Sequence, residues 1–498
     1  MSNPPSPSLL ITLRDRLGPK GFTTDAADMA PWLEDWRRRY HGAAAAMLSP
    51  ASPEEVSDIV RLCAAEGVAL VPQGGNTSMV GGATPTADGE ALLLSLRRMN
   101  KVRSVSAEAN IAIAEAGVIL ANLHEAAASV GRRFPLSLGA KGSAMVGGLV
   151  STNAGGTQVL RFGTMRELVE GIEAVLPDGS TFSSLAALKK DNRGYDLRQL
   201  LIGAEGTLGV VTAASLKLVP AVGSRTVAWC GLPSPDKALA FLRLLDNAVG
   251  DAVESFELVP RQALELVLAH VAGTRAPLQG DHAWHVLIEA VAPMVAPSPE
   301  KELGRALRAA LEIGVIEDAA IAQNEAQAEA FWRIRDSISE AEKKDGPAAK
   351  HDVSVEVSAM PAFMVEAAAE VERRFPGTRV VAFGHLGDGN VHFNVRAPEG
   401  AGADWIEQDG LAVTALVHDL VTAAGGSISA EHGIGQMRLA ELARLGDPAR
   451  LAAMRAIKTA LDPKGIMNPG KLVPPPDPAQ PSPFDFAQDR LAEGTDRQ

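Results

Sequence analysis

Apolar and polar residues alternate along most of the chain with the periods of helices and strands. Residues 52–66 show a helical period, because apolar residues recur at the spacing of one helix face. These residues are Val56, Ile59, Val60 and Cys63. Ser52 stands at the N-cap, Glu55 closes a capping box and Gly67 follows the last turn, so both ends of the helix are marked. A strand at 68–72 runs directly into a glycine-rich loop, which indicates an α/β unit with a ligand at the carboxyl end of the strand.

The pattern changes along the rest of the chain. Between 91 and 220, short β-branched strands alternate with helices and glycine-rich loops. The strands expected there are 91–96, 111–116, 172–179 and 209–219. From 223 to 425, longer helical patterns at 234–249 and 325–344 stand between isolated strands, which predicts a second, α+β domain. Short helices are expected at 9–18 and 31–42, and another at 439–447.

Size and composition indicate a globular protein of several domains. The chain has 498 residues, which is more than one hydrophobic core usually serves. Apolar residues make up 46% and charged residues 21%, the profile of an ordinary globular protein. Past Val473 the chain is rich in proline and polar residues, which predicts a disordered tail over 474–498.

Charge and cysteine content exclude several classes of function. The formal net charge is 47 − 60 = −13 without a long basic run, which argues against nucleic acid or an anionic membrane surface as a partner. Cys63 and Cys230 are the only cysteines, so a disulfide framework, a thiolate zinc site and an iron–sulfur cluster are unsupported. No secretory signal and no transmembrane segment is recognisable, and we expect a soluble, cytoplasmic protein.

Two glycine-rich segments, 71–82 and 135–156, are candidates for a dinucleotide site. Glycine lets backbone N–H groups approach phosphate oxygens without a Cβ in the way. Hydroxyl and amide donors accompany the glycines, at Thr77, Ser78, Ser143, Thr152 and Asn153. Neither segment matches the Rossmann glycine fingerprint, and no Walker lysine pattern is present. Two tight turns in a strand-rich domain are the alternative.

These two segments, together with GAEGTLGVV (203–211) and DPKGIMNPGK (462–471), resemble the FAD domain of vanillyl-alcohol-oxidase-type (PCMH-type) flavoproteins. The resemblance implies an α+β fold: an N-terminal helical segment, an FAD-binding domain of two α/β subdomains, a substrate- and metal-binding α+β domain with an antiparallel sheet, and a C-terminal helical segment that completes the active site and the flavin site. The corresponding ranges are 1–44, 45–222, 223–425 and 426–473.

The same resemblance implies which residues contact FAD. They are Pro72, Gln73, Gly74, Gly75, Asn76, Thr77, Ser78, Leu138, Gly142, Ser143, Gly148, Thr152, Glu205, Gly209, Val210 and Asn468. Some members of the family attach the flavin covalently through a histidine of the first loop. The loop here contains Gly74, Gly75 and Asn76 and no histidine, so non-covalent FAD is expected.

A third glycine-rich stretch, VAFGHLGDGNVHFNV (381–395), carries two histidines around a predicted bend. The period of two in the second strand places His392 and Asn394 on one face, and the bend brings His385 to the same end. Two imidazoles so placed suit a divalent ion such as Zn²⁺, and ISAEHGIG (428–435) offers Glu431 as a third ligand. A plain hairpin turn at Asp388-Gly389 and packed histidines are the alternatives.

Residues 384–395 and 429–435 are similar to segments of FAD-dependent D-2-hydroxy acid dehydrogenases, above all those that act on D-2-hydroxyglutarate. The resemblance implies that His385, His392 and Glu431 bind a metal, that Asn394 contacts substrate, and that His432 is the catalytic base. It also implies that Arg335, Ser339 and Lys350 hold the far carboxylate of the substrate. The family has threonine where this chain has Ser339, which keeps the hydroxyl and loses a methyl group. A solvated helix face is the alternative for Arg335.

The chemistry of the reaction agrees with this set of residues. Oxidation of a 2-hydroxy acid removes a proton from the hydroxyl group and a hydride from the same carbon. A divalent ion lowers the pKa of the hydroxyl, a histidine accepts the proton, and N5 of the flavin accepts the hydride. Two cations favour a dicarboxylate, D-2-hydroxyglutarate or D-malate, over lactate.

Several alternatives stay open at this point. D-lactate or glycolate is the alternative substrate, a flavin-free zinc-dependent hydrolase is the alternative enzyme, and a non-catalytic flavin-binding or electron-relay subunit is a third. The expected electron acceptor is an electron-transfer flavoprotein or a quinone, with oxygen undecided, while the missing Rossmann fingerprint disfavours NAD. Zn²⁺ is the expected metal, and two histidines with a glutamate also suit Mn²⁺ and Co²⁺. A homodimer is compatible with the sequence, which leaves the oligomeric state open.

Overall fold

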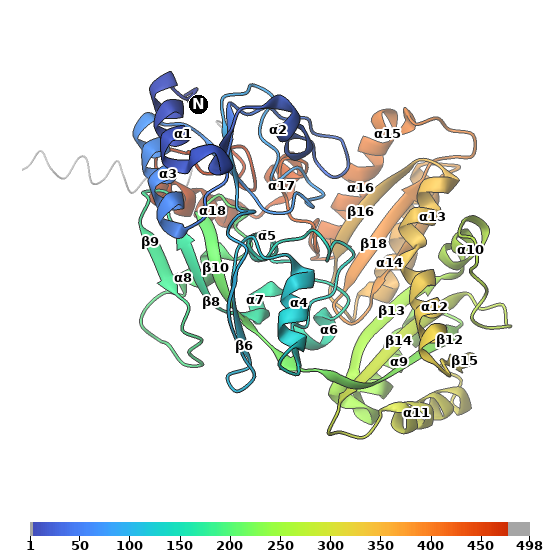
Figure 1. Ribbon diagram of the computed structural model, residues 1–498. Helices are drawn as coiled ribbons and strands as arrows, with labels where there is room; N and C mark the ends of the chain where they lie inside the picture. The colour runs from blue at the N-terminus through green and yellow to red at the C-terminus, as the bar shows by residue number, and fades with distance from the viewer. Residues whose placement is uncertain (1–2, 477–498) are drawn as a thin grey trace, which may run out of the picture. The chain divides into compact units, whose positions relative to one another are not determined.

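The computed structural model describes residues 3–476, and the chain divides into two compact units (Figure 1). Among the described residues, the first unit comprises 3–154, 164–219 and 432–476, and the second comprises 155–163 and 220–431. The second unit thus takes in a short segment that the sequence analysis places inside the FAD-binding domain. The disordered tail predicted at 474–498 lies outside the described residues from 477 onward.

A four-stranded sheet forms one half of the first unit. Its strands, in spatial order, are β1 (Phe22–Thr23), β2 (Ala46–Leu48), β4 (Leu92–Ser95) and β3 (Leu70–Gln73). β2 and β3 each pair with β4 in parallel. Helices α1 (Pro7–Gly21) and α3 (Pro53–Glu66) pack their apolar faces against this sheet. This packing buries the strands, as is usual where strands pair in parallel.

Helix α3 is confirmed within a residue of its predicted ends. The Ser52 hydroxyl accepts a hydrogen bond from the Glu55 N–H at 3.3 Å, and Gly67 ends the helix with a φ of +72°. The Glu55 carboxylate accepts from the N–H of Ala51 at 2.7 Å instead of from Ser52, so the predicted capping box is shifted by one residue.

The helix predicted at 31–42 is wrong. Helix α2 (Ala26–Leu33) ends shortly after the predicted start, and an irregular turn follows. The carboxylate of Asp35 explains this, because it accepts hydrogen bonds from the backbone N–H groups of Arg37, Arg39 and Tyr40 at 2.6–3.0 Å. An aspartate that binds its own following backbone competes with helical hydrogen bonds.

A five-stranded antiparallel sheet forms the other half of the first unit. Its strands, in spatial order, are β5 (Val102–Ser106), β6 (Ile111–Glu115), β10 (Val210–Lys217), β8 (Val169–Val175) and β9 (Thr181–Ser184). The strands predicted at 91–96, 111–116, 172–179 and 209–219 are confirmed as β4, β6, β8 and β10. The helices of this half are α4 (Leu120–Ala128), α5 (Val146–Ser151), α7 (Met165–Leu168) and α8 (Leu197–Leu201).

The second unit is built on one seven-stranded antiparallel sheet. Its strands, in spatial order, are β15 (Asp318–Ile321), β12 (Val222–Leu232), β14 (Trp284–Pro293), β13 (Val253–Pro260), β17 (Arg379–His385), β18 (Asn390–Arg396) and β16 (Ala348–Ser354). The strands that look isolated in the sequence therefore belong to a single sheet. Long helical segments separate them along the chain, so their pairing is not visible from sequence spacing.

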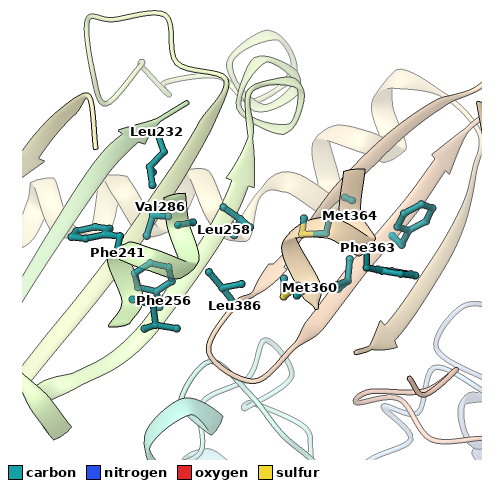
Figure 2. Packing of buried hydrophobic residues seen from close by; sticks show 14 of the residues in the cluster. Leu232, Phe241, Phe256, Leu258, Val286, Met360, Phe363, Met364 and Leu386 are labelled. Carbon is teal, nitrogen blue, oxygen red and sulfur yellow. The ribbon is translucent and has the colours of Figure 1, made fainter. Parts of the chain in front are cut away.

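Helices cover both faces of this sheet. On one face lie α9 (Pro235–Ala248), α11 (Glu300–Glu312), α14 (Met360–Arg374) and α16 (Gly410–Ala423). On the other lie α10 (Arg261–His270), α12 (Glu325–Asp336) and α13 (Ile338–Asp345). In the core on the α9 face, Phe241 packs against Phe256 with ring centres 5.9 Å apart. Figure 2 shows Leu386 between Phe256 and Met360 in the same core. The loop between β17 and β18 is thereby anchored in a hydrophobic core.

The helix predicted at 325–344 is divided into α12 and α13 at Ser337. The remaining short elements are α6 (Val159–Phe162), β7 (Arg132–Arg133), β11 (Val219–Pro220), η1 (Gly250–Ala252), α15 (Trp405–Gln408), α17 (Leu439–Leu445) and α18 (Pro448–Leu461). No helix within residues 3–476 is long and apolar enough to cross a membrane.

Candidate active site

The two glycine-rich segments of the first unit lie against each other. The loop that follows β3 packs on the segment that leads into α5, and a Cβ on Gly75 would collide with the backbone oxygen of Ser143. A Cβ on Gly74 would lie 3.5 Å from the N atom of Gly148. This close approach of two backbones requires glycine, and it places both predicted FAD-binding loops in one region, as a single site demands.

The polar side chains of the first loop mainly hold the loop itself. The Gln73 amide donates to the backbone oxygens of Trp32 and Ala83, each at 2.9 Å, and the Asn76 amide donates to that of Glu34 at 2.8 Å. Their amide N–H groups are therefore used inside the protein. The backbone of 74–78 is what this loop offers to a phosphate.

Strained backbone conformations gather in the predicted FAD-binding motifs. Asn76, Asn153, Glu205 and Asn468 have positive φ angles of 53°, 49°, 50° and 42°, in the left-handed region that non-glycine residues rarely adopt. Such residues persist where the surroundings impose them and cluster at ligand sites. All four belong to segments on which the resemblance to FAD domains rests.

The C-terminal motif returns to the first loop. The N–H of Asn468 donates to the backbone oxygen of Leu70 at 2.8 Å, so residues 466–468 lie along β3. The Asn468 side chain donates to the backbone oxygens of Gly82 at 2.9 Å and Glu205 at 2.7 Å. One asparagine thus ties three of the four predicted motifs together.

Glu205 holds the segment that follows His432. Its two carboxylate oxygens accept hydrogen bonds from the N–H groups of Ile434 and Gly435, each at 2.8 Å. A Cβ on Gly433, which has a φ of +82°, would lie 2.7 Å from the carboxylate. Burial raises the pKa of Glu205, although these two N–H donors oppose the shift. The side chain predicted to contact FAD is therefore engaged with the backbone next to the predicted base.

The remaining predicted cofactor residues occupy the same part of the first unit. Gly142 and Gly148 face open space, where an added Cβ would meet no atom within 4 Å. Among the described residues, Gln73 Oε1 and Asn468 Oδ1 are buried without a hydrogen-bond partner. The Val210 side chain lies in the hydrophobic core, so only its backbone could meet a ligand. Open space at these glycines and buried acceptors without partners in the same unit both fit a bound dinucleotide.

The other residues of the predicted flavin set are placed as follows. Pro72 lies in β3, Thr77 and Ser78 follow in the first loop, Leu138 lies in the second glycine-rich segment, Thr152 caps α5 and Gly209 precedes β10.

In the second unit, β17 and β18 form the predicted hairpin, with His385 opposite Asn390. Two of its glycines are required because a side chain at either position would collide with the backbone. A Cβ on Gly384 would collide with the backbone oxygen of Asn390, and one on Gly389 with that of Val355. Gly389 also has a φ of +79°. The glycine-rich bend is thus a hairpin turn, and this hairpin also places the two histidines close together.

The register of β18 and β16 gathers polar residues on one face of the sheet. Lys350 lies opposite Asn394, and Asp352 lies opposite His392. The predicted alternation of His392 and Asn394 on one face is confirmed by these pairings. The ring centres of His385 and His392 are 5.6 Å apart, with the ring planes at 74°.

A buried glutamate joins two of the predicted site residues. Glu257, in β13, accepts a hydrogen bond from Nδ1 of His385 at 2.7 Å with one oxygen and from Nε of Arg335 at 2.8 Å with the other. Nε2 of His385 lies 3.8 Å from a carboxylate oxygen of Glu431 and 3.4 Å from Nη2 of Arg335. His385, Arg335 and Glu431 are therefore brought together as predicted.

The charges of this cluster shift one another. Burial would raise the pKa of Glu257, but His385 and Arg335 outweigh it and lower that pKa to about 2. Burial would lower the pKa of His385, but the charge of Glu257 outweighs it and raises that pKa to about 9.

Glu431 lies among further carboxylates. Its backbone N–H donates to Asp352 at 3.0 Å. Burial raises the pKa of Glu431; the charge of His385 opposes this shift, while Asp352 and Asp388 add to it. The carboxylates of Glu431, Asp352 and Asp388 lie near the His385 ring, and their negative charges favour the binding of a cation.

Lys350 and Asn394 share a second buried glutamate. Glu342, in α13, accepts from Nζ of Lys350 at 2.9 Å and from the Asn394 amide at 2.8 Å with the same oxygen. Its other oxygen is buried and has no hydrogen-bond partner among the described residues. Ser339 is exposed and lies in α13, whereas Arg335 lies in α12 with its side chain only 11% exposed. The helix predicted at 325–344, which would carry both residues, is therefore interrupted at Ser337.

The predicted base His432 directly follows Glu431 and is half-buried. The boundary between the two compact units falls between these residues. Within residues 3–476, no group of three or more histidine, cysteine, aspartate or glutamate side chains is assembled so that all could bind one metal ion.

Sequence reasoning missed Glu257 and Glu342. Glu257 stands in β13, whose residues are all buried, and Glu342 is fully buried in α13. Acidic residues in a mostly apolar strand are a detectable signal, because a buried carboxylate needs a partner. For Glu342 the surrounding helix sequence is charged, so no such signal exists.

Comparison with known families agrees with this geometry. Residues 44–184 match the FAD binding domain family, and residues 223–472 match the family described as FAD linked oxidases, C-terminal domain. The chain belongs to the FAD-linked oxidase family. The predicted family and the FAD-binding domain are thereby confirmed, and the two matched ranges fall on the glycine-rich segments and on the unit that carries His385.

This FAD-linked oxidase has similar relatives over nearly its whole length. It is 39% identical over 464 residues to the D-2-hydroxyglutarate dehydrogenase of Xanthomonas citri pv. viticola, covering 93% of this chain and 96% of the relative. It is 36% identical to the mitochondrial D-2-hydroxyglutarate dehydrogenase of Arabidopsis thaliana, covering 93% and 80%. It is 34% identical to a putative mitochondrial D-lactate dehydrogenase of Schizosaccharomyces pombe, covering 91% and 86%.

Among solved structures, p-cresol methylhydroxylase has the same fold, with a TM-score of 0.71 at 15% identity, covering 94% of this chain and 96% of that one. Together with the family matches, this likeness confirms the predicted fold class: a PCMH-type FAD-binding domain with an α+β domain built on a large antiparallel sheet.

Proposed function

We propose that this enzyme oxidises D-2-hydroxyglutarate to 2-oxoglutarate with FAD and a divalent metal ion. The observation that carries the proposal is the group formed by His385, Glu431 and Arg335 on one side of the second-unit sheet, where Nε2 of His385 lies 3.8 Å from Glu431. A metal-binding imidazole beside a carboxylate-binding guanidinium suits a 2-hydroxy acid, which offers a hydroxyl and carboxylates.

The types of the residues present suit a divalent ion, although within residues 3–476 they are not assembled around one point and would have to move to hold it. Glu257 binds Nδ1 of His385 and leaves Nε2 directed toward Glu431, which is the carboxylate–histidine arrangement common at metal sites. His385, His392 and Glu431 would hold the ion. Binding of the ion at Nε2 of His385 requires Nη2 of Arg335, 3.4 Å away, to leave that atom. We infer Zn²⁺ as the ion, and the same ligand types accept Mn²⁺ or Co²⁺.

When bound, the flavin supplies a hydride acceptor and the divalent ion supplies Lewis acidity for the hydroxyl group. The protein supplies the rest. His432 accepts the hydroxyl proton on an imidazole nitrogen, which requires a neutral ring at the working pH. Glu431 is a metal ligand and leaves the role of base to its chain neighbour. Arg335, Lys350 and Asn394 orient the carboxylates of the substrate.

The surroundings of Arg335 and Lys350 support their predicted contact with the substrate, and those of Ser339 do so less. Arg335 retains terminal N–H groups beyond its bond to Glu257, and Lys350 retains a donor beyond its bond to Glu342. Ser339 is exposed, and only its backbone oxygen is near Lys350, at 3.5 Å. The name of the relative that is 39% identical supports hydroxyglutarate as the substrate.

D-lactate is the rival substrate, and one observation favours it. Both predicted cations already have a buried carboxylate partner, since Glu257 pairs with Arg335 and Glu342 pairs with Lys350. The net positive charge at Arg335 and Lys350, which would attract the second carboxylate of a dicarboxylate substrate, is therefore smaller than the sequence suggests.

The test is reduction of the flavin under anaerobic conditions. Purified flavin-loaded enzyme is mixed with D-2-hydroxyglutarate, D-malate, D-lactate, glycolate and the L-enantiomers, and the visible absorbance of the flavin is followed. The proposal predicts the fastest bleaching with D-2-hydroxyglutarate. Preferential bleaching by D-lactate would support the rival substrate, and no bleaching by any hydroxy acid would contradict the proposed reaction.

A further inference from the structure

Glu257 lies where two functional groups of the proposed site meet. It is 1% exposed, in a strand whose residues are all buried. A carboxylate in such a place is costly unless each oxygen is paired. Here each oxygen has one partner, and the two partners come from different elements: His385 from β17 and Arg335 from α12.

On the side of His385, Glu257 determines which ring nitrogen is available. Its oxygen accepts a hydrogen bond from Nδ1–H at 2.7 Å, so Nε2 carries the lone pair once the ring is neutral. Nε2 is also the atom that lies near Glu431, at 3.8 Å. Without an acceptor at Nδ1, the ring could take the other tautomer or rotate, and Nε2 would no longer be held toward the second ligand.

On the side of Arg335, Glu257 fixes the guanidinium group through Nε at 2.8 Å. The ring of Phe383 supports the same group, with the guanidinium carbon 5.2 Å from the ring centre. These two contacts hold the plane of the guanidinium. Nη2 also lies 3.4 Å from Nε2 of His385, which leaves Nη1 as the terminal group that is free to bind a ligand while that contact is kept. A bidentate contact with a carboxylate depends on such a fixed plane.

We infer that Glu257 is a positioning residue that sets both the metal-binding imidazole and the carboxylate-binding guanidinium, so that metal affinity and substrate affinity depend on one buried side chain. The inference rests on the proposed function, because it takes His385 as a metal ligand and Arg335 as a substrate-binding residue. Glu257 itself touches neither ligand in this account.

The decisive variant is Glu257→Gln, which keeps the shape of the side chain. A glutamine has one acceptor oxygen and an NH₂ group that only donates, so it cannot accept hydrogen bonds from both partners. We expect the dissociation constant for Zn²⁺ to rise by about 10- to 100-fold, the range typical when the partner of a metal-binding histidine is lost. The KM for D-2-hydroxyglutarate should rise in the same variant, while the flavin content stays unchanged.

Glu254→Gln is the matched control. Glu254 lies in the same strand, is fully buried and forms an ion pair with Arg161 at 3.2 Å. Its partners Gln158 and Arg161 belong to the segment 155–163, whereas Glu257 is paired with His385 and Arg335. A general loss of stability from removing a buried carboxylate would affect both variants, whereas loss of positioning affects only Glu257→Gln.

The measurement is competition for Zn²⁺ between the flavin-loaded protein and a fluorescent chelator, with KM and kcat determined separately. Equal Zn²⁺ affinity in Glu257→Gln and the unchanged enzyme would overturn the inference, as would an equal loss in Glu254→Gln. If the unchanged enzyme bound no Zn²⁺ at all, the metal in the proposed function would be wrong as well.

Glu257→Asp serves if Glu257→Gln does not fold. Aspartate keeps the charge but is one methylene shorter, so it cannot reach both partners at once. A smaller loss of Zn²⁺ affinity in the same competition assay is expected, and an unchanged affinity would again overturn the inference.

Discussion

Lys350 is predicted to bind the far carboxylate of the substrate, and that role stays a prediction. The structure gives the lysine a partner within the protein, because its Nζ lies 2.9 Å from the buried carboxylate of Glu342. Removing Lys350 alone would leave that carboxylate buried without its cation, which destabilises a protein by several kcal/mol whatever the lysine does in catalysis. A test of substrate selection must therefore change both residues.

The first prediction compares Lys350→Met/Glu342→Gln with Glu342→Gln alone. If Lys350 binds the second carboxylate of the substrate, its loss removes a charge-assisted hydrogen bond worth about 1.5–3 kcal/mol, or roughly 10- to 100-fold in kcat/KM. We expect kcat/KM for D-2-hydroxyglutarate to fall by this factor between the two variants while that for D-lactate changes little. An unchanged ratio of the two kcat/KM values would show that Lys350 does not select the substrate.

At the scale of residues, chemistry that depends on residue type was predictable and chemistry that depends on contacts across the sheet was not. His385, His392 and Glu431 were found from motif and spacing, and the structure brings His385 and Glu431 together. Glu257 was not found, because β13 is far from β17 in sequence and only their antiparallel pairing places Glu257 opposite His385. The role of His385, His392 and Glu431 as a metal site stays a prediction.

At the scale of elements, the β17–β18 hairpin is the part that positions the histidines. Its loop is held by Leu386 in the hydrophobic core and by close contacts at its glycines. Gly389 combines a φ of +79° with a position where a Cβ would collide with the backbone oxygen of Val355. Gly400 has a nearly identical φ of +80° but open space around it, so it offers a control for backbone strain alone.

The second prediction concerns alanine at these two positions. Gly400→Ala should cost about 1–2 kcal/mol of unfolding free energy, the strain of a left-handed alanine. Gly389→Ala should cost clearly more, because the hairpin must also move away from Val355. Denaturant unfolding of both variants measures the difference. Equal losses would mean that the loop is not constrained by its neighbour.

Local signals explain which elements were predicted. Helix α3 and the strands β3, β4, β6, β8 and β10 carry their own caps, periods and neighbouring glycines, so they are predicted within a few residues. The short strands β1, β2, β5 and β9 are missed. The helix predicted at 31–42 failed because the Asp35 carboxylate binds the following backbone, a competition that periodicity does not show. The break between α12 and α13 at Ser337 contains no proline or glycine, so the sequence gives no signal for it.

At the scale of the whole molecule, folding stability should depend on a histidine outside the proposed active site. His285 is 3% exposed, and burial, with the charges of His282 and Arg261, lowers its pKa to about 4. The ring is therefore neutral in the folded protein and charges more readily in the unfolded chain. A lowered pKa of a base contributes stability above the unfolded pKa of about 6.5 and loses it as the pH falls toward the folded pKa.

The third prediction follows from this shift. Between pH 6.5 and pH 4, His285 should withdraw up to about 3 kcal/mol of unfolding free energy. The variant His285→Gln keeps an acceptor for the Trp229 indole N–H, which lies 3.1 Å from Nδ1, and should show a flatter decline over the same range. Urea unfolding at a series of pH values compares the two slopes. Identical slopes would contradict the assignment of a neutral, buried His285.

The central claim is that an enzyme of the FAD-linked oxidase family uses a divalent ion at His385, His392 and Glu431 to oxidise a D-2-hydroxy acid. The most direct measurement removes all metal from flavin-loaded protein with a chelator, adds D-2-hydroxyglutarate without oxygen and follows the absorbance of the flavin. The account predicts that reduction is slowed at least about 100-fold and is restored by added Zn²⁺ or Mn²⁺. Reduction at the full rate in the metal-free protein would contradict it.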